Sequence, residues 1–255
     1  MQLTTFVDRL DAELRTDDYA GVDASPNGLQ VGTRAGEVEH VAFAVDAADA
    51  TIDAAVDADA DALVTHHGLV WGGLDRVTGR EYERIAPLVE NDIVLYVSHL
   101  PLDGHQELGN AAGIGDLLSL ESRDPFGEVG PETIGQVGEC EEPIAREELR
   151  ATLNQELDTG GREIRTLEFG PDRAEQVAVI TGSGVDWLDE AVAVDADTFV
   201  TGEGKQQVYH EAKEAGINVV LAGHYATETF GVRSLQELVE EWGLTTTYVD
   251  HPTGL

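Results

Sequence analysis

Residues 60–68 read Ala-Asp-Ala-Leu-Val-Thr-His-His-Gly, and residues 196–204 read Ala-Asp-Thr-Phe-Val-Thr-Gly-Glu-Gly. A second pair also matches: residues 92–103 (Asp-Ile-Val-Leu-Tyr-Val-Ser-His-Leu-Pro-Leu-Asp) and residues 216–228 (Gly-Ile-Asn-Val-Val-Leu-Ala-Gly-His-Tyr-Ala-Thr-Glu). Each member of the second pair is an apolar strand pattern that ends in His-x-x-x-acid. These repeats predict an internal duplication, with two similar α/β lobes facing each other across a pseudo-twofold axis. Chance similarity of short strand–helix units is the alternative.

Strand and helix patterns alternate along the whole chain, which favours an α/β fold. We expect the first lobe at residues 1–125 and the second at residues 126–255, with the boundary near 123–130. A Gly- and Glu-rich stretch, 127–142, lies between them, and the last helix is able to pack back on the first lobe. Strands are predicted at 38–45, 62–65, 93–98, 176–181, 198–201, 219–222 and 245–249, and helices at 1–14, 51–60, 80–91, 146–156, 187–194, 206–215 and 235–241.

The charge of the chain is its strongest compositional feature. Its 255 residues include 15 Lys+Arg and 50 Asp+Glu, which gives a formal net charge of −35. An acidic solvated surface is one interpretation; we favour adaptation to molar salt, as in extreme halophiles. At about 1 M salt the Debye length is about 3 Å, so like-charge repulsion is screened and carboxylates keep the surface hydrated. In either case the negative electrostatic field of the protein repels nucleic acid and anionic membranes, so neither is expected as a partner.

Other compositional features indicate a cytoplasmic globular protein. Hydrophobic residues make up 42% of the chain, and no apolar run reaches the length of about 18 residues that a membrane span needs. Residues 1–14 form an amphipathic helix pattern that lacks the basic end and continuous apolar core of a signal peptide. The single cysteine, Cys140, excludes an intrachain disulfide and a cysteine-based zinc site.

Candidate metal ligands follow the apolar strands, which is where open α/β sheets place their sites. Imidazole and carboxylate groups suit divalent zinc, manganese, iron, cobalt or nickel. Adjacent histidines serve two neighbouring metals better than one, and two metals about 3.5–4 Å apart would activate a shared water and polarise a substrate oxygen. The candidate group consists of His66, His67, His99, Asp103, His224 and Glu228. We therefore predict a pair of divalent metal ions held by His66, His67, Asp103, His224 and Glu228.

Each of these residues also has a simpler interpretation. A single histidine at a strand end is more often a hydrogen-bonded structural residue, and a His-x-x-x-acid pair can be a local ion pair. The metal hypothesis depends on the convergence of two such pairs on duplicated strands with His66 and His67 on a third. Gly182-Ser183-Gly184, which follows another strand, either binds an anion through backbone N–H groups or forms a tight turn.

At these residues the chain resembles the GTP cyclohydrolase type 2 homologues, also called Nif-three-like proteins. The resemblance extends over nearly the whole chain in the family's order, and the motifs together are specific. The matching stretches are Asn-Gly-Leu-Gln-Val-Gly (27–32), Thr-His-His-Gly (65–68), Ser-His-Leu-Pro-Leu-Asp (98–103), Leu-Gly-Asn (108–110), Gly-Ser-Gly (182–184), Thr-Gly-Glu (201–203) and Ala-Gly-His-Tyr-Ala-Thr-Glu (222–228).

The resemblance implies two like α/β lobes, a dinuclear metal site between them, and assembly into ring-shaped homohexamers. It also implies that His67, Asp103 and Glu228 hold one metal, and that His66, His224 and Glu228 hold the other. His99 matches a family histidine beside the site. Three departures bear on substrate preference without removing a ligand: Ser25-Pro26-Asn27 replaces Trp-Asp-Asn, residues 68–71 (Gly-Leu-Val-Trp) replace Pro-Leu-Ile-Phe, and Leu100-Pro101 replaces Thr-Asn.

The resulting functional hypothesis is a metal-dependent hydrolase acting on a nucleotide or related small molecule. The family name implies attack at C8 of the guanine of GTP, with ring opening and formate release, although fold or family does not fix a reaction. The alternative is a non-catalytic metal-binding scaffold, a metal chaperone or a partner of regulatory proteins.

Overall fold

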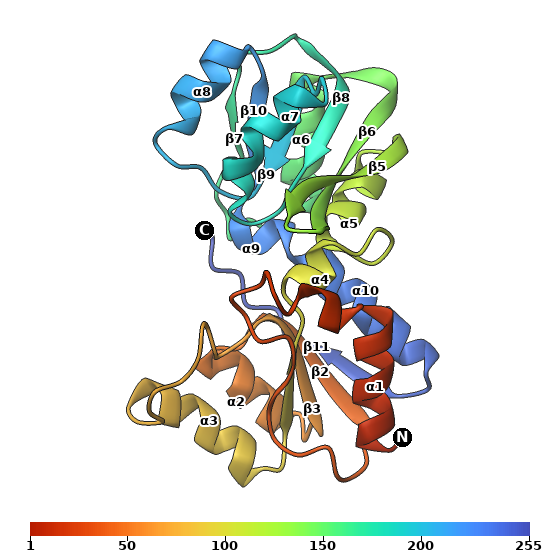
Figure 1. The fold of residues 1–255 in the computed structure, drawn as a ribbon, viewed down its shortest axis with the longest axis vertical. Coiled ribbons are helices and arrows are strands. Elements are labelled where there is room, and N and C mark those ends of the chain that lie inside the picture. The colour runs from red at the N-terminus through yellow and green to blue at the C-terminus, as the bar shows by residue number, and fades with distance from the viewer. The chain divides into compact units, whose positions relative to one another are not determined.

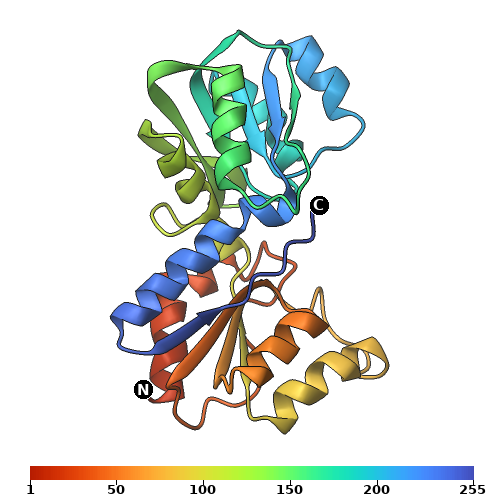
Figure 2. The same cartoon turned by 180° about the vertical axis from the view of Figure 1, so that it is seen from behind.

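The computed structural model describes residues 1–255 and divides them into two compact units (Figure 1). The first unit consists of Met1–Leu102 and Gly231–His251, and the second of Asp103–Phe230 and Pro252–Leu255. Each unit contains one β-sheet with helices on both of its faces (Figure 2). The predicted fold of two α/β lobes is therefore confirmed.

The sheet of the first unit has the strand order β1-β4-β3-β2-β11. Strands β2, β3, β4 and β11 are parallel, whereas β1 runs antiparallel to β4 at the edge. The run of buried residues in β2 and β3 is what a parallel sheet covered on both faces requires. The strands are β1 (Gly28–Val31), β2 (His40–Asp46), β3 (Ala62–His67), β4 (Val94–Val97) and β11 (Thr245–Tyr248).

Helices cover both faces of this sheet. Helices α1 (Leu3–Glu13) and α10 (Thr229–Glu241) lie on one face, and α2 (Asp49–Asp57) and α3 (Arg80–Glu90) lie on the other (Figures 1 and 2). Alternate residues of the strands supply one core against α2 and α3, because successive side chains of a strand point to opposite faces. This core includes Ala42, Ala44, Leu63 and Leu95 from the strands, with Ile52 and Leu88 from the helices.

The sheet of the second unit has the order β5-β6-β8-β9-β10-β7. Its centre, β8, β9 and β10, is parallel, and the outer strands β5, β6 and β7 pair antiparallel. Each unit thus contains three consecutive parallel strands with an antiparallel strand beside the third. The strands are β5 (Leu120–Val129), β6 (Glu132–Ala145), β7 (Arg165–Leu167), β8 (Arg173–Val179), β9 (Thr198–Thr201) and β10 (Asn218–Leu221).

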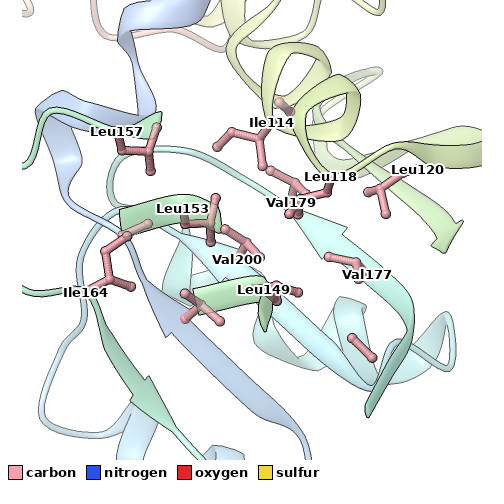
Figure 3. Packing of buried hydrophobic residues seen from close by; sticks show 14 of the residues in the cluster. Ile114, Leu118, Leu120, Leu149, Leu153, Leu157, Ile164, Val177, Val179 and Val200 are labelled. Atoms are coloured by element: carbon pink, nitrogen blue, oxygen red, sulfur yellow. The ribbon is translucent and has the colours of Figure 1, made fainter. Parts of the chain in front are cut away.

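The second unit buries a hydrophobic core under α5 (Asn110–Leu117) and α6 (Arg146–Glu156) (Figure 3). Ile114 of α5 and Leu149 and Leu153 of α6 point onto Val179 and Val200 of the sheet. Helices α7 (Leu188–Ala193) and α8 (Val208–Ala215) lie on the opposite face. The single-turn helices α4 (Leu100–Asp103) and α9 (His224–Thr227) and the 3-10 turns η1 (Thr16–Tyr19) and η2 (Gly184–Trp187) complete the chain.

The two units repeat the same hydrogen bonds at the same aligned positions. Asp61 Oδ2 accepts the backbone N–H groups of Glu39 and His40 at 2.8 and 2.9 Å. Asp197 Oδ2 accepts the equivalent pair, from Glu175 and Gln176, at 2.8 and 3.0 Å. Each aspartate thereby accepts the two backbone N–H groups that directly precede the parallel pairing with the neighbouring strand. This agreement in detail supports an internal duplication over chance similarity of short units.

The stretch 127–142, which the sequence suggested as a connection between the lobes, is part of a long hairpin instead. Strands β5 and β6 form it, and β6 also pairs with β8, so the hairpin belongs to the sheet of the second unit. The predicted boundary near residues 123–130 lies within this hairpin. The structure divides the chain at Leu102/Asp103, because α5 contributes Ile114 to the core of the second unit. Gly231–His251 belongs to the first unit, where β11 pairs with β2.

Candidate metal centre

The first unit gathers three histidines at the carboxyl ends of two neighbouring parallel strands. His66 and His67 end β3, and His99 follows β4 by two residues. Potential ligand nitrogens of the three lie within 4.8 Å of one another. The ring centroids of His66 and His67 are 4.6 Å apart, and that of His99 is 5.1 Å from His66 and 5.7 Å from His67. The structure therefore brings these predicted residues into one cluster.

Each histidine of the cluster is oriented by an oxygen atom at Nδ1. His66 Nδ1 lies 2.9 Å from the backbone carbonyl of Ser98, and His67 Nδ1 lies 2.8 Å from Oδ1 of Asp46. His99 Nδ1 lies 2.9 Å from Oδ1 of Asp23. Carbonyl and carboxylate oxygens only accept, so Nδ1 donates the hydrogen in all three rings. In the neutral ring the lone pair is then on Nε2, the atom available to a metal.

Asp23 is a buried carboxylate whose hydrogen bonds fix His99. Burial acts to raise the pKa of Asp23, but the hydrogen bond and charge of His99, with hydrogen bonds from Asn27 and Ser25, outweigh it and lower that pKa. Asp23 Oδ2 also accepts from the Leu100 N–H at 3.0 Å, and Asn27 Oδ1 accepts from the His99 N–H at 2.7 Å. The carboxylate is thus held ionised and in one orientation.

In the second unit, Asp103 is buried and held by two side chains. Its Oδ1 accepts from Asn110 Nδ2 at 2.8 Å and from the Thr181 hydroxyl at 3.2 Å. Asn110 begins α5, and Thr181 follows β8. These contacts fix one carboxylate oxygen of Asp103 and therefore the direction of the whole group.

His224 and Glu228 contact each other across the single turn of α9. His224 Nε2 lies 3.3 Å from Glu228 Oε1, and His224 Nδ1 lies 3.1 Å from Glu203 Oε1. Burial acts to lower the pKa of His224, but the hydrogen bonds and charges of Glu228 and Glu203 outweigh it and raise the pKa to about 9. The two carboxylates thus favour the protonated ring, whose Nε2–H faces Glu228 and whose Nδ1–H faces Glu203.

The Gly182-Ser183-Gly184 segment serves as a tight turn that makes room for this pair. The N–H groups of Gly182 and Gly184 already donate to the hydroxyls of Thr227 and Thr201, at 3.1 and 3.0 Å, which argues against an anion cradle. A Cβ at position 182 would lie 2.2 Å from Glu228 Oε1, so only glycine fits there. Since Thr181 contacts Asp103 and Gly182 contacts Glu228, this turn links the predicted acidic ligands of the second unit.

Sequence reasoning did not assign Asp23, Asp46 or Glu203, the three carboxylates that orient histidines. The Ser183 hydroxyl donates to Glu203, and this hydrogen bond is the main reason that the pKa of Glu203 is lowered, with burial opposing it. Asp46 could have been found, because it is the polar residue that directly follows the apolar run 41–45 of β2. Asp23 lies outside any strand or helix, and no pattern in the sequence marks it.

Comparison with known proteins gives consistent similarity over the full chain. Residues 1–252 match the model of the family Duf34/NIF3 (NGG1p interacting factor 3). Proteins described as "GTP cyclohydrolase 1 type 2 homolog" are 53% identical in Halobacterium salinarum and 41% identical in Pyrococcus abyssi, each over 100% of both chains. The crystal structure of TTHA1606 from Thermus thermophilus is 38% identical, with a TM-score of 0.90 over 100% of both chains.

The Halobacterium relative supports the halophilic source that the acidic composition predicts. No helix of the structure has the length and apolar character needed to cross a membrane.

Proposed function

Because this chain belongs to the Duf34/NIF3 family, we propose that it is a metal-dependent hydrolase with two divalent metal ions. The ligands would be His66, His67, Asp103, His224 and Glu228. When bound, two such cations supply Lewis acidity, which lowers the pKa of water and polarises a substrate oxygen. The observation that carries the proposal is the fixed Nδ1 of each histidine. Histidines that bind metals almost always donate their second ring N–H to a carboxylate or a carbonyl in this way.

The residues fit a pair of borderline divalent cations. Imidazole nitrogens and carboxylate oxygens suit zinc, manganese, iron, cobalt or nickel. We assign His67, Asp103 and Glu228 to one ion and His66, His224 and Glu228 to the other, with His99 beside them. A cation at His224 Nε2 would replace the proton on that nitrogen, which faces Glu228, while Nδ1–H would still donate to Glu203.

The proposed substrate class is a nucleotide or a related heterocycle, and GTP is the first compound to test, given the description of the relatives. Protein loaded with zinc or manganese in molar KCl is expected to release formate from GTP and to form a product with pterin-precursor absorbance. His67→Ala is expected to abolish turnover. His210→Ala is the matched control, because His210 is exposed on α8, and it should leave turnover unchanged.

A panel of nucleotides, phosphodiesters and cyclic amides separates this proposal from its alternative. Turnover of any member that disappears in His67→Ala supports a hydrolase and identifies its substrate. Full metal occupancy without turnover of any of them would contradict the hydrolase and favour a non-catalytic metal-binding scaffold.

Loss of a carboxylate that orients a histidine is expected to weaken metal binding. Asp46→Ala removes the acceptor of His67 Nδ1 and should weaken metal binding about 10- to 100-fold, as loss of such partners does in other metal sites. Competition with a chromogenic chelator measures the affinity. Asp49→Ala is the matched control, since Asp49 pairs with Arg84 on the surface, 2.9 Å apart, and carries the same charge. Equal affinities of Asp46→Ala and wild type would show that Asp46 does not orient a ligand.

We also propose that the chain assembles as a homohexamer. The resemblance to Nif-three-like proteins supports this assembly, and sedimentation in molar KCl measures it.

A further inference from the structure

An exposed tryptophan lies directly beside the histidine cluster of the first unit. The ring centroid of Trp71 is 5.1 Å from that of His99, with the planes at 81°, and 6.0 Å from that of His67. The residue is nevertheless 48% exposed. Single exposed apolar side chains are ordinary on protein surfaces, but this indole packs on imidazoles that are candidate metal neighbours rather than on the core.

Backbone hydrogen bonds on both sides of Trp71 hold it in this position. The N–H groups of Leu69 and Val70 donate to Gln30 Oε1 at 3.0 and 3.2 Å, and the Gly72 N–H donates to the Ala24 carbonyl at 2.9 Å. Gly68 lies close against Gln30, because a Cβ at position 68 would be 2.4 Å from Oε1. The indole is thus presented by its loop without being buried, and such fixed aromatic side chains are typical walls of ligand pockets.

A small pocket opens beside Trp71. Its volume is about 130 Å³, and its lining includes the apolar side chains of Leu69, Leu74 and Ile85 together with Arg80, Glu81 and Arg84. Arg80 lies 3.6 Å from Glu81 and Arg84 lies 2.9 Å from Asp49, and each guanidinium has five N–H groups, more than one such contact uses. Pockets that enclose a whole small molecule measure about 300–1,000 Å³, so this one has room for a single ring. The two arginines are among only 15 basic residues of the chain, and their N–H groups only donate hydrogen bonds.

We propose that Trp71 and this pocket bind a planar heteroaromatic ring of the nucleobase class. The ring would stack on the indole, and its edge acceptors would face the guanidinium groups of Arg80 and Arg84. This inference deepens the proposed function and rests on it, since the ring would belong to the substrate presented to the metals. An apolar wall, a stacking surface and guanidinium donors fit a flat ring with nitrogen and carbonyl acceptors better than a sugar.

The experiment is calorimetric titration of metal-loaded protein in molar KCl with guanosine, adenosine and ribose. The nucleosides are neutral, so the −35 charge of the chain does not repel them. Wild type should bind the two nucleosides and not ribose. Trp71→Leu should raise the Kd for nucleosides at least about fivefold, because base–aromatic stacking contributes that much or more, and Trp71→Phe should lie between them. Tyr82→Leu is the matched control, as an exposed aromatic residue on α3 outside the pocket lining, and should bind like wild type.

Intrinsic fluorescence gives an independent readout. The chain has three tryptophans; Trp187 donates to the Glu128 carbonyl, and Trp242 stacks under Arg9. Guanosine should quench the wild type, and the quenching should disappear in Trp71→Phe even though calorimetry still detects binding.

Metal content, measured by elemental analysis of every variant, separates this inference from the proposed function. Trp71→Leu should keep the wild-type metal content. Nucleoside binding that is equal in Trp71→Leu and wild type, or absent from a metal-loaded wild type, would overturn the ring subsite and leave the metal proposal intact. A wild type that holds no metal after loading would overturn the proposed function instead. A changed oligomeric state of Trp71→Leu with unchanged nucleoside binding would assign Trp71 to a subunit interface and also overturn the subsite.

Discussion

Glu228→Gln is expected to weaken the binding of both metal ions together, whereas Asp103→Ala and His224→Ala should each empty mainly one position. In the proposed assignment, the Glu228 carboxylate would serve both ions. Two dications a few ångströms apart repel strongly, and a bridging anion offsets that repulsion. The buried position of Glu228, against Gly182 and His224, gives it little solvent to screen its charge. Glutamine keeps the size of the side chain, so the substitution isolates the loss of charge.

Elemental analysis of protein purified without chelator measures this effect. We expect about two ions per chain in wild type, about one in Asp103→Ala and in His224→Ala, and fewer than one in Glu228→Gln. Glu214→Gln is the matched control, because Glu214 is exposed on α8, and it should retain the wild-type content. Two tightly bound ions in Glu228→Gln would show that Glu228 is not a bridge.

The second large effect is expected when the salt concentration is lowered, and it concerns stability and assembly. With a formal net charge of −35, the folded chain should lose stability, and its oligomers should dissociate, as KCl falls below about 1 M. The reason is that the Debye length grows from about 3 Å at 1 M to about 8 Å at 0.15 M, so carboxylates that were screened repel one another. Thermal melts and sedimentation across KCl concentrations measure both losses.

A variant with fewer charges tests whether repulsion is the cause. Asp53→Asn, Glu214→Gln and Glu237→Gln together remove three exposed helical carboxylates without touching the core. This triple variant should need less KCl than wild type to reach the same melting temperature. A melting temperature that does not depend on KCl would contradict the halophilic interpretation.

The elements that could be predicted from the sequence are those with a clear local pattern. The helix at 146–156 and the strand at 198–201 have the bounds that their periodicity predicts. The β5–β6 hairpin was not predicted, because its glycines and glutamates resemble a connection when read locally. Its strands are stabilised by pairing with each other and by the pairing of β6 with β8, whose partner residues lie 28 to 43 positions further along the chain.

In the candidate site, too, some residues could be predicted from local patterns and others could not. His66, His67 and His99 could be grouped because each follows an apolar strand, and parallel strands end at one edge of a sheet. Asp23 could not, because the chain brings it to His99 through a loop that Asn27 and Ser25 hold by hydrogen bonds. Patterns in sequence mark the groups that a regular element positions, whereas residues that orient them from loops depend on tertiary contacts.

The repeated hydrogen bonds of Asp61 and Asp197 also show which positions of the two duplicated units are equivalent. They align position 66 with 202 and position 67 with 203, so one ancestral strand end has become His66-His67 in one copy and Gly202-Glu203 in the other. After a gene duplicates, each copy can lose a task that the other retains. In the first unit position 67 holds the candidate ligand His67, and in the second the equivalent Glu203 orients His224. These two equivalent positions have thus diverged, one into a candidate ligand and the other into a carboxylate that orients a candidate ligand.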